Sequence, residues 1–209
     1  SLVSDEDLQA ILSKIELIGY IKRCLEKGKK VYIITYNYDI FLERIFRLAG
    51  IEFGVYGFGD ADKDVEIFKP HGSISFSFKI KIQEYSPYTI RDFISESISQ
   101  NATDFEIKYQ LKDDHPIVNA IIPPAGDAER FRFGWIKDIR NGIDKIVSES
   151  TSKDEMILFG LSYWHVDRNE IDEILLSMDN KMEVRFVNPN PPTALEAVLT
   201  SLFRNYIHF

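Results

Sequence analysis

One short segment limits most strongly what this chain can fold into: residues 31–39, Val-Tyr-Ile-Ile-Thr-Tyr-Asn-Tyr-Asp. Its first half is apolar and largely β-branched, and its second half is polar. A short run that is apolar on both faces is typical of a buried parallel strand. Open α/β sheets bind their ligands at the carboxyl ends of such strands. The sequence therefore predicts that Thr35, Asn37 and Asp39 lie where a ligand can touch them.

Three further apolar strands are each followed by small or polar residues. They are Val65–Phe68, followed by His71, Gly72 and Ser73; residues 156–159, followed by Gly160 and Ser162; and residues 184–187, followed by Asn188. Helical periodicity separates the strands, which favours a mainly parallel sheet with helices on both faces. We therefore expect an α/β protein with a Rossmann-like, doubly wound fold. In that fold the ends marked by Asn37, His71, Ser162 and Asn188 converge on one crevice.

The remaining segments are consistent with a single domain over residues 1–209. Helices are expected over about 4–26, 38–48, 135–147, 168–178 and 193–203, with Ser4 and Asp167 as N-caps and Glu170 completing a capping box. Residues 74–82 alternate apolar and polar, as in a half-exposed strand, and 118–122 form another apolar strand. The polar stretch at about 84–114 is predicted to be an insertion, and the glycine-rich residues 54–60 an ordinary loop. Phe41, Ile45 and Leu48 would form the buried face of the second helix.

Charge and cysteine content exclude several classes of function. The chain carries 25 basic and 33 acidic residues, a net charge of −8, with no basic cluster, so nucleic acid is not an expected partner. The one cysteine, Cys24, cannot form an internal disulfide or a cysteine-rich zinc site. No apolar run is long enough to span a bilayer, and no signal peptide is visible. We expect a cytoplasmic protein without membrane contact.

Taken in order, the strand-end motifs resemble those of sirtuin-like domains, which bind and consume NAD+. The motifs are Thr35-Tyr36-Asn37-Tyr38-Asp39, Lys69-Pro70-His71-Gly72-Ser73, Phe159-Gly160-Leu161-Ser162 with Asp167, and Val187-Asn188-Pro189. The order is closer to the bacterial sirtuin-like NAD+ hydrolases, often found in anti-phage defence, than to protein deacetylases. The segment Ile121-Ile122-Pro123-Pro124 also fits that branch. The resemblance extends over roughly three-quarters of the chain, about residues 31–189.

The resemblance implies a role for each predicted site residue. Asn37 would orient the nicotinamide ribose or the attacking water, and His71 would act as the base. Contacts to NAD+ are implied for Thr35, Asp39, Gly72, Ser73, Gly160, Ser162 and Asn188. NAD+ is implied as the substrate, ADP-ribose as a bound product, and no metal is expected. A homo-oligomer or a fused or associated effector is an expected partner.

The sequence departs from the family in two places. No Gly-Ala-Gly-type loop precedes residue 31, so we expect either that upstream residues supply it or that the fold dispenses with it. No four-cysteine zinc module follows the His-Gly motif, which favours NAD+ hydrolysis over deacetylation. The alternative function is a non-catalytic nucleotide-sensing or assembly module. A metal-dependent phosphoesterase is disfavoured, because no Asp-x-His or Gly-Asn-His pair is present.

Several predicted site residues also have purely structural interpretations. Asn37 and Asp39 are both favoured as helix caps, and His71 could sit in a turn bonded to backbone groups. Ser162 could bond only its local backbone. The aromatic residues 163–165 are predicted to pack rather than to form a binding lip.

Overall fold

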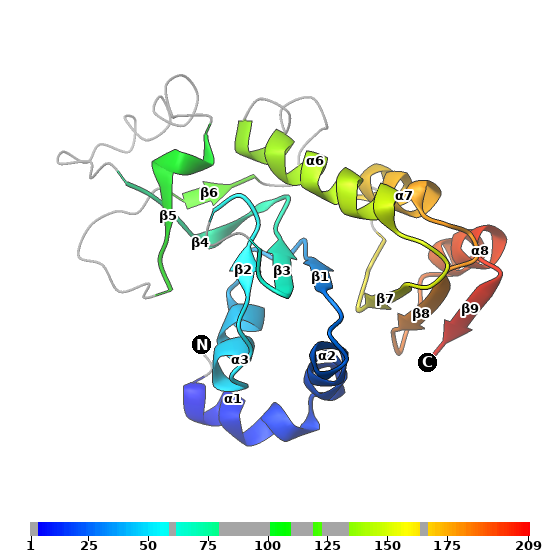
Figure 1. The fold of residues 1–209 in the computed structure, drawn as a ribbon, viewed down its shortest axis with the longest axis horizontal. Coiled ribbons are helices and arrows are strands. Elements are labelled where there is room, and N and C mark those ends of the chain that lie inside the picture. The colour runs from blue at the N-terminus through cyan, green and yellow to red at the C-terminus, as the bar shows by residue number, and fades with distance from the viewer. Residues whose placement is uncertain (1–3, 59–61, 80–100, 110–118, 123–133, 164–166) are drawn as a thin grey trace. The chain divides into compact units, whose positions relative to one another are not determined.

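The computed structural model describes residues 4–58, 62–79, 101–109, 119–122, 134–163 and 167–209 (Figure 1). The chain divides into two compact units. Unit 1 comprises Ser1–Pro123 and Asp127–Ile139, and unit 2 comprises Pro124–Gly126 and Arg140–Phe209. The single domain predicted from the sequence stays a prediction. Most of the predicted insertion, residues 84–100 and 110–114, lies outside the described residues.

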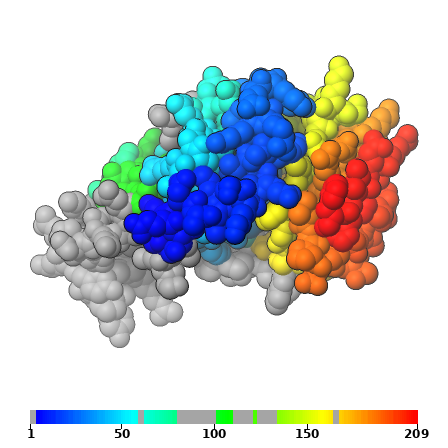
Figure 2. All heavy atoms as spheres, turned by 90° about the horizontal axis from the view of Figure 1, so that it is seen from below, coloured from blue at the N-terminus to red at the C-terminus, as the bar shows by residue number. Residues whose placement is uncertain are grey.

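Three helical segments open unit 1 in place of the one long helix predicted over residues 4–26. They are α1 (Asp5–Ile11), the short 3₁₀ helix η1 (Leu12–Lys14) and α2 (Glu16–Glu26). The chain bends at Ile15, whose backbone is extended, because α1 packs on α3 (Phe41–Leu48) while α2 lies against β1 (Val31–Ile34). Figure 2 shows these dark blue helices at the surface of unit 1.

Both ends of this helical region are as predicted. The Ser4 side chain accepts the Asp7 N–H at 3.1 Å in a capping box. Gly28, with φ +66°, follows the last turn.

A parallel sheet forms the centre of unit 1. Its strands are β1, β3 (Val65–Phe68) and β2 (Gly54–Val55), in the order β1-β3-β2 (Figure 1). Val31 pairs with Val65 and Ile34 with Phe68, so β1 and β3 end side by side. Their parallel pairing is confirmed, but the prediction that the first strand is buried on both faces is wrong, because Tyr32 is 44% exposed. One face is closed by a core of residues from α2, α3 and β3, namely Ile18, Ile21, Ile45, Phe46, Ala49, Ile51, Val65 and Ile67.

The buried face of α3 differs from the prediction. Phe41 is 41% exposed, whereas Glu43 and Phe46 are fully buried beside Ile45. The predicted stripe was out of phase, because the helix turns Leu42, Ile45, Phe46 and Ala49 toward the sheet. One carboxylate, that of Glu43, is thereby carried into the interior.

A second, antiparallel sheet follows β3 directly. Its central strand, β4 (Gly72–Phe78), lies between β5 (Phe105–Ile107) and β6 (Asn119–Ile121). The strand predicted from alternation therefore exists, but the prediction that it is half-exposed is wrong. Its serine face is as buried as its apolar face: Ser73, Ser75 and Ser77 are at most 2% exposed. The serines avoid water because neighbouring polar groups inside the protein satisfy them.

The segment after β2 packs rather than forming an open loop. The Phe58 ring stacks on Phe76 of β4, with centroids 3.9 Å apart, and meets the edges of Phe105 and of Trp135 in α6 (Gly134–Glu149). Such aromatic contacts add to the burial of apolar area. Of the predicted ordinary loop at residues 54–60, Gly54 and Val55 instead form β2, residues 56–58 lie in a packed turn, and 59 and 60 lie outside the described residues.

Unit 2 contains a second parallel sheet, with strands β7 (Glu155–Phe159), β8 (Glu183–Val187) and β9 (Asn205–His208) in that order. Helices α7 (Arg168–Ser177) and α8 (Thr193–Leu202) connect them. The core contains Leu175, Met182, Val184, Phe186, Leu195 and Leu199. The two predicted strands and helices are confirmed, and β9 is an addition. The chain is thus a mixed α/β protein with parallel sheets.

Candidate functional site

A tight turn carries the predicted base. The Gly72 N–H donates to the Lys69 carbonyl at 2.9 Å, which closes the turn through Pro70 and His71. Gly72 has φ +80°, a conformation that favours glycine because it has no Cβ. The role of Gly72 that the structure describes is therefore to shape the backbone behind His71.

The loop after β1 carries the other predicted residues of unit 1. The Thr35 N–H donates to the Phe68 carbonyl at 2.9 Å, which extends the pairing of β1 with β3. The Asp39 carboxylate accepts the Phe41 N–H at 2.9 Å in a local turn that leads into α3, whose N-cap is Ile40. Asn37 is exposed, and its backbone N–H donates to Thr35 Oγ1 at 3.3 Å. The predicted helix cap by Asn37 or Asp39 is therefore wrong, because Ile40 is the N-cap of α3 and no side chain caps it, and the Asn37 side chain is exposed to solvent.

His71 lies between two tyrosine rings of that loop. The imidazole is 3% exposed; its centroid is 5.0 Å from that of Tyr36, edge to face, and 6.1 Å from that of Tyr38. The Tyr38 hydroxyl donates to the Ile122 carbonyl at 2.8 Å, and the Ile122 N–H donates to the His71 carbonyl at 3.0 Å. The structure therefore brings the Asn37 loop and the His71 turn together at the carboxyl ends of two adjacent parallel strands.

A buried ion pair lies beneath these two segments. Lys69 is 1% exposed and Glu43 is 0% exposed, and Lys69 Nζ is 2.6 Å from Glu43 Oε1. Lys69 Nζ also donates to the Asp39 carbonyl and to Ser73 Oγ. Ser73 Oγ in turn donates to the Tyr38 carbonyl at 3.2 Å and lies 2.9 Å from Ser75 Oγ. Ser73, predicted to contact NAD+, is instead fully buried in this network.

The negative charge of Glu43 helps to raise the pKa of a neighbouring tyrosine, Tyr109. Burial and the Glu43 charge together raise the pKa of Tyr109 to about 12, although Arg47 opposes the shift. The Arg47 guanidinium lies 3.7 Å from the Tyr109 ring centroid, in a cation–π contact. Tyr109 is consequently a neutral phenol at physiological pH.

The predicted residues of unit 2 lie on two loops that bond to each other. The Gly160 N–H donates to the Val187 carbonyl, and Asn188 Nδ2 donates to the Leu161 carbonyl, both at 3.1 Å. Asn188 Oδ1 accepts the Asn190 N–H at 3.0 Å, so its amide bridges the two strand ends. Ser162 is exposed between them. Gly160, Ser162 and Asn188 are thus brought together, in the other unit from Asn37 and His71.

After Ser162, the predicted capping box of α7 is wrong and the predicted packing of Tyr163 is confirmed. Asp167 occupies the N-cap position of α7, but it makes no side-chain capping bond within the described chain. The predicted capping box is therefore wrong: Glu170 instead lies 4.0 Å from Arg140. Tyr163 packs as predicted, 5% exposed, and its hydroxyl donates to Asp172 at 2.5 Å. Trp164 and His165 lie outside the described residues.

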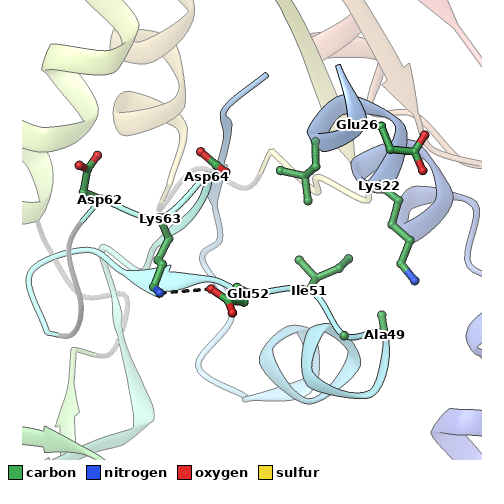
Figure 3. A pocket seen from close by; sticks show the side chains of 10 residues that line it. Lys22, Glu26, Ala49, Ile51, Glu52, Asp62, Lys63 and Asp64 are labelled. Atoms are coloured by element: carbon green, nitrogen blue, oxygen red, sulfur yellow. Dashed lines mark hydrogen bonds and ion pairs between the residues drawn. The ribbon is translucent and has the colours of Figure 1, made fainter. Parts of the chain in front are cut away.

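An open hollow of unit 1 lies at the opposite end of the parallel sheet (Figure 3). It has a volume of about 500 Å³ and is lined by residues that precede β1, β2 and β3, namely Lys22, Leu25, Glu26, Ala49, Gly50, Ile51, Glu52, Asp62, Lys63 and Asp64. Lys63 pairs with Glu52 at 3.3 Å, which is the dashed line in Figure 3. The lining is mixed in charge and contains no predicted site residue, so we do not assign the ligand site to it.

Sequence reasoning missed Glu43 and the two tyrosine rings. Glu43 has a detectable signal, because it lies three residues after Ile40 and three residues before Phe46, which are both apolar and buried. A carboxylate at such a position needs a buried partner. Lys69, which directly follows an apolar strand, is the matching cation.

No protein-family model matches this sequence, and the comparison with curated proteins finds no significant match. Among the described residues, no three or more His, Cys, Asp or Glu side chains are grouped as metal ligands would be. No helix in the described ranges is long and apolar enough to cross a membrane. The likeness to sirtuin-like domains therefore rests on the four strand-end motifs alone.

Proposed function

We propose that this chain is a sirtuin-like domain that binds NAD+ at the carboxyl ends of β1 and β3 and hydrolyses it to nicotinamide and ADP-ribose. The observation that supports it is the meeting of the Asn37 loop with the His71 turn at adjacent parallel strand ends, where open sheets bind ligands. A Rossmann-like doubly wound sheet, with Gly160, Ser162 and Asn188 contacting the adenosine part, belongs to this proposal.

The chemistry asks little of the protein beyond orientation and one proton transfer. The bond between the ribose anomeric carbon and the nicotinamide nitrogen breaks, and its electron pair leaves with neutral nicotinamide. A water oxygen bonds to that carbon and gives up a proton. In this proposal Asn37, which is exposed on its loop, orients the ribose or the water. Histidine, with an ordinary pKa of about 6.5, is suited to accept the proton near neutral pH.

Access to His71 requires a local movement. The imidazole is 3% exposed and lies against Tyr36 and Tyr38. In this proposal the ligand displaces a tyrosine ring from the imidazole as it enters. Both rings then exclude bulk water from the reacting carbon.

The second candidate is a binding-only module that senses NAD+ or ADP-ribose. Two observations favour it: the burial of His71, and the absence of any strand with a glycine-rich loop among the described residues 4–30, which are mostly helical. A dinucleotide pyrophosphate usually rests on such a loop. Binding without turnover would still stabilise the fold by mass action.

The test is nicotinamide release from NAD+, followed by NMR, for the wild type and for Asn37→Ala and His71→Gln. We expect release by the wild type and loss of release in both variants, with melting temperatures close to wild type for Asn37→Ala. Glu52→Gln, at the far end of the sheet, is the matched control and should retain full release. Full activity of both site variants would refute the catalytic proposal. A melting-temperature rise with ADP-ribose but no release would select the binding-only module.

A further inference from the structure

The Lys69 ammonium uses all three of its protons on three different segments. It donates to Glu43 Oε1 in α3 at 2.6 Å, to the Asp39 carbonyl in the loop after β1, and to Ser73 Oγ in β4 at 3.2 Å. An ammonium has three donors and no acceptor, so this cation is fully satisfied. One buried side chain thereby ties together the helix, the Asn37 loop and the strand after His71.

The loop is bound at two consecutive carbonyls. The Tyr38 carbonyl accepts the Ile74 N–H at 2.9 Å and Ser73 Oγ at 3.2 Å, and the Asp39 carbonyl accepts Lys69 Nζ. These bonds begin one residue after Asn37, whose own side chain is exposed. The position of Asn37 relative to His71 is therefore set largely by the groups that Lys69 and Ser73 hold.

The ion pair is not built for stability. Desolvating two charges costs several kcal/mol per ion, and the cost is recovered only when all their polar atoms are satisfied. Glu43 Oε2 is buried and has no hydrogen-bond partner among the residues that the structure describes. Apolar residues of similar volume commonly stabilise a fold as well as such a pair does. A different role is needed to explain charges at this place.

We propose that Lys69 and Glu43 are positioning residues, which hold the loop of residues 35–40 against the turn of residues 69–73 so that Asn37 and His71 keep a fixed separation. Glu43 holds the Lys69 ammonium in one orientation. In that orientation the ammonium donates to the Asp39 carbonyl and to Ser73 Oγ. Neither side chain touches the ligand. The part of this inference that concerns NAD+ rests on the proposed function, whereas the fixing of the loop does not.

The test uses the double variant Lys69→Met/Glu43→Leu, which removes both charges together and leaves no unpaired ion in the core. Amide hydrogen exchange by NMR compares the Ile74 N–H, which bonds the Tyr38 carbonyl, with the Tyr56 N–H, which bonds the Ile67 carbonyl at 2.9 Å within the sheet. We expect Ile74 to exchange at least tenfold faster than in the wild type, with Tyr56 changed less than threefold. An equal change at both amides, or none at Ile74, would overturn the proposal.

Arg44→Met is the matched control, because Arg44 is the next residue of the same helix and pairs with Asp5 at the surface. It removes an ion pair of α3 without touching the loop, and exchange at Ile74 should stay within threefold of wild type. A tenfold faster exchange of the Ile74 N–H in this control would mean that any loosening of α3 frees the loop. That result would refute a specific role of Lys69 and Glu43.

A second experiment, on ligand affinity, distinguishes failure of this inference from failure of the proposed function. ADP-ribose affinity is measured by calorimetry for the wild type, the double variant and Arg44→Met. We expect at least tenfold weaker binding by the double variant alone, with an unchanged melting temperature. Wild-type affinity in the double variant would overturn the positioning role for the ligand site. Failure of the wild type to bind would refute the proposed function instead, and the exchange result would then decide the positioning of the loop.

Discussion

The two parallel sheets end in loops that look alike in sequence and differ in burial. After β1 and β3 in unit 1, the loops are joined through a lysine and a glutamate that are both at most 1% exposed. After β7 and β8 in unit 2, the join is made by the half-buried amide of Asn188. The charges on β8 stay near the surface, where Arg185, 37% exposed, pairs with Glu155 at 2.6 Å.

The difference follows from what comes next in the chain. In unit 1 the turn after β3 leads directly into β4, whose serine face is buried and accepts the lysine. In unit 2 the residues after β7, Gly160 to Ser162, stay at or near the surface. In unit 1 the polar groups after the strands are therefore held by buried partners, whereas in unit 2 they are held by amide and backbone bonds near the surface.

The largest expected effect comes from breaking the buried pair on one side. Lys69→Met alone should lower the free energy of unfolding by about 3–5 kcal/mol, because Glu43 is left as an unpaired buried charge. Arg185→Met, its counterpart in unit 2, should cost less than about 1 kcal/mol, as expected of a solvent-screened pair. Urea denaturation followed by circular dichroism measures both. Equal losses would remove the contrast between the two strand-end regions.

A smaller contrast is expected between the two glycines at the strand ends. Gly72 is buried at φ +80°, and Gly72→Ala should cost about 1–3 kcal/mol through backbone strain. Gly160, at φ +60°, has no atom within 4 Å of an added Cβ, so Gly160→Ala should cost only about 1 kcal/mol. Thermal denaturation compares the two variants. A larger cost at Gly160 would show that the loop of unit 2 is the more constrained one.

The smallest expected effect concerns the tyrosine that fixes the unit 2 loop. Burial and the bond to Asp172 raise the pKa of Tyr163 to about 12, so the folded state favours the protonated phenol. Its contribution to stability is therefore complete below the ordinary pKa of about 10 and is lost as pH rises from there to about 12. Tyr163→Phe should lower the free energy of unfolding by about 1 kcal/mol at pH 7. The stability of this variant should also fall less steeply than that of the wild type as pH rises above about 10. The pKa of Tyr109 in unit 1 is also raised to about 12, so some loss of stability with rising pH remains in this variant. An unchanged slope in urea titrations at pH 9 to 12 would contradict the assignment.

Local patterns were sufficient to predict most of the elements. The apolar runs at β1, β3, β7 and β8 predicted parallel strands, and the pairing is parallel, although Tyr32 of β1 and Phe159 of β7 are exposed. The cap at Ser4 and the stop at Gly28 were predicted because such signals act within a few residues. Alternation also located β4, but it assigned the serines to solvent, whereas all three are buried and Ser73 bonds a lysine supplied by the preceding turn.

By itself, the sequence determined where the strands end and that His71 and the Asn37 loop follow two of them. The tertiary structure alone decided that Glu43 points inward to meet Lys69, that Ser73 is buried and bonded to the Tyr38 carbonyl, and that Tyr36 and Tyr38 lie against His71. The reason is physical. Strand and cap signals depend on residues close together in the sequence. Lys69, the partner of the buried Glu43, lies 26 residues away, and the two pair only when packing excludes water from both.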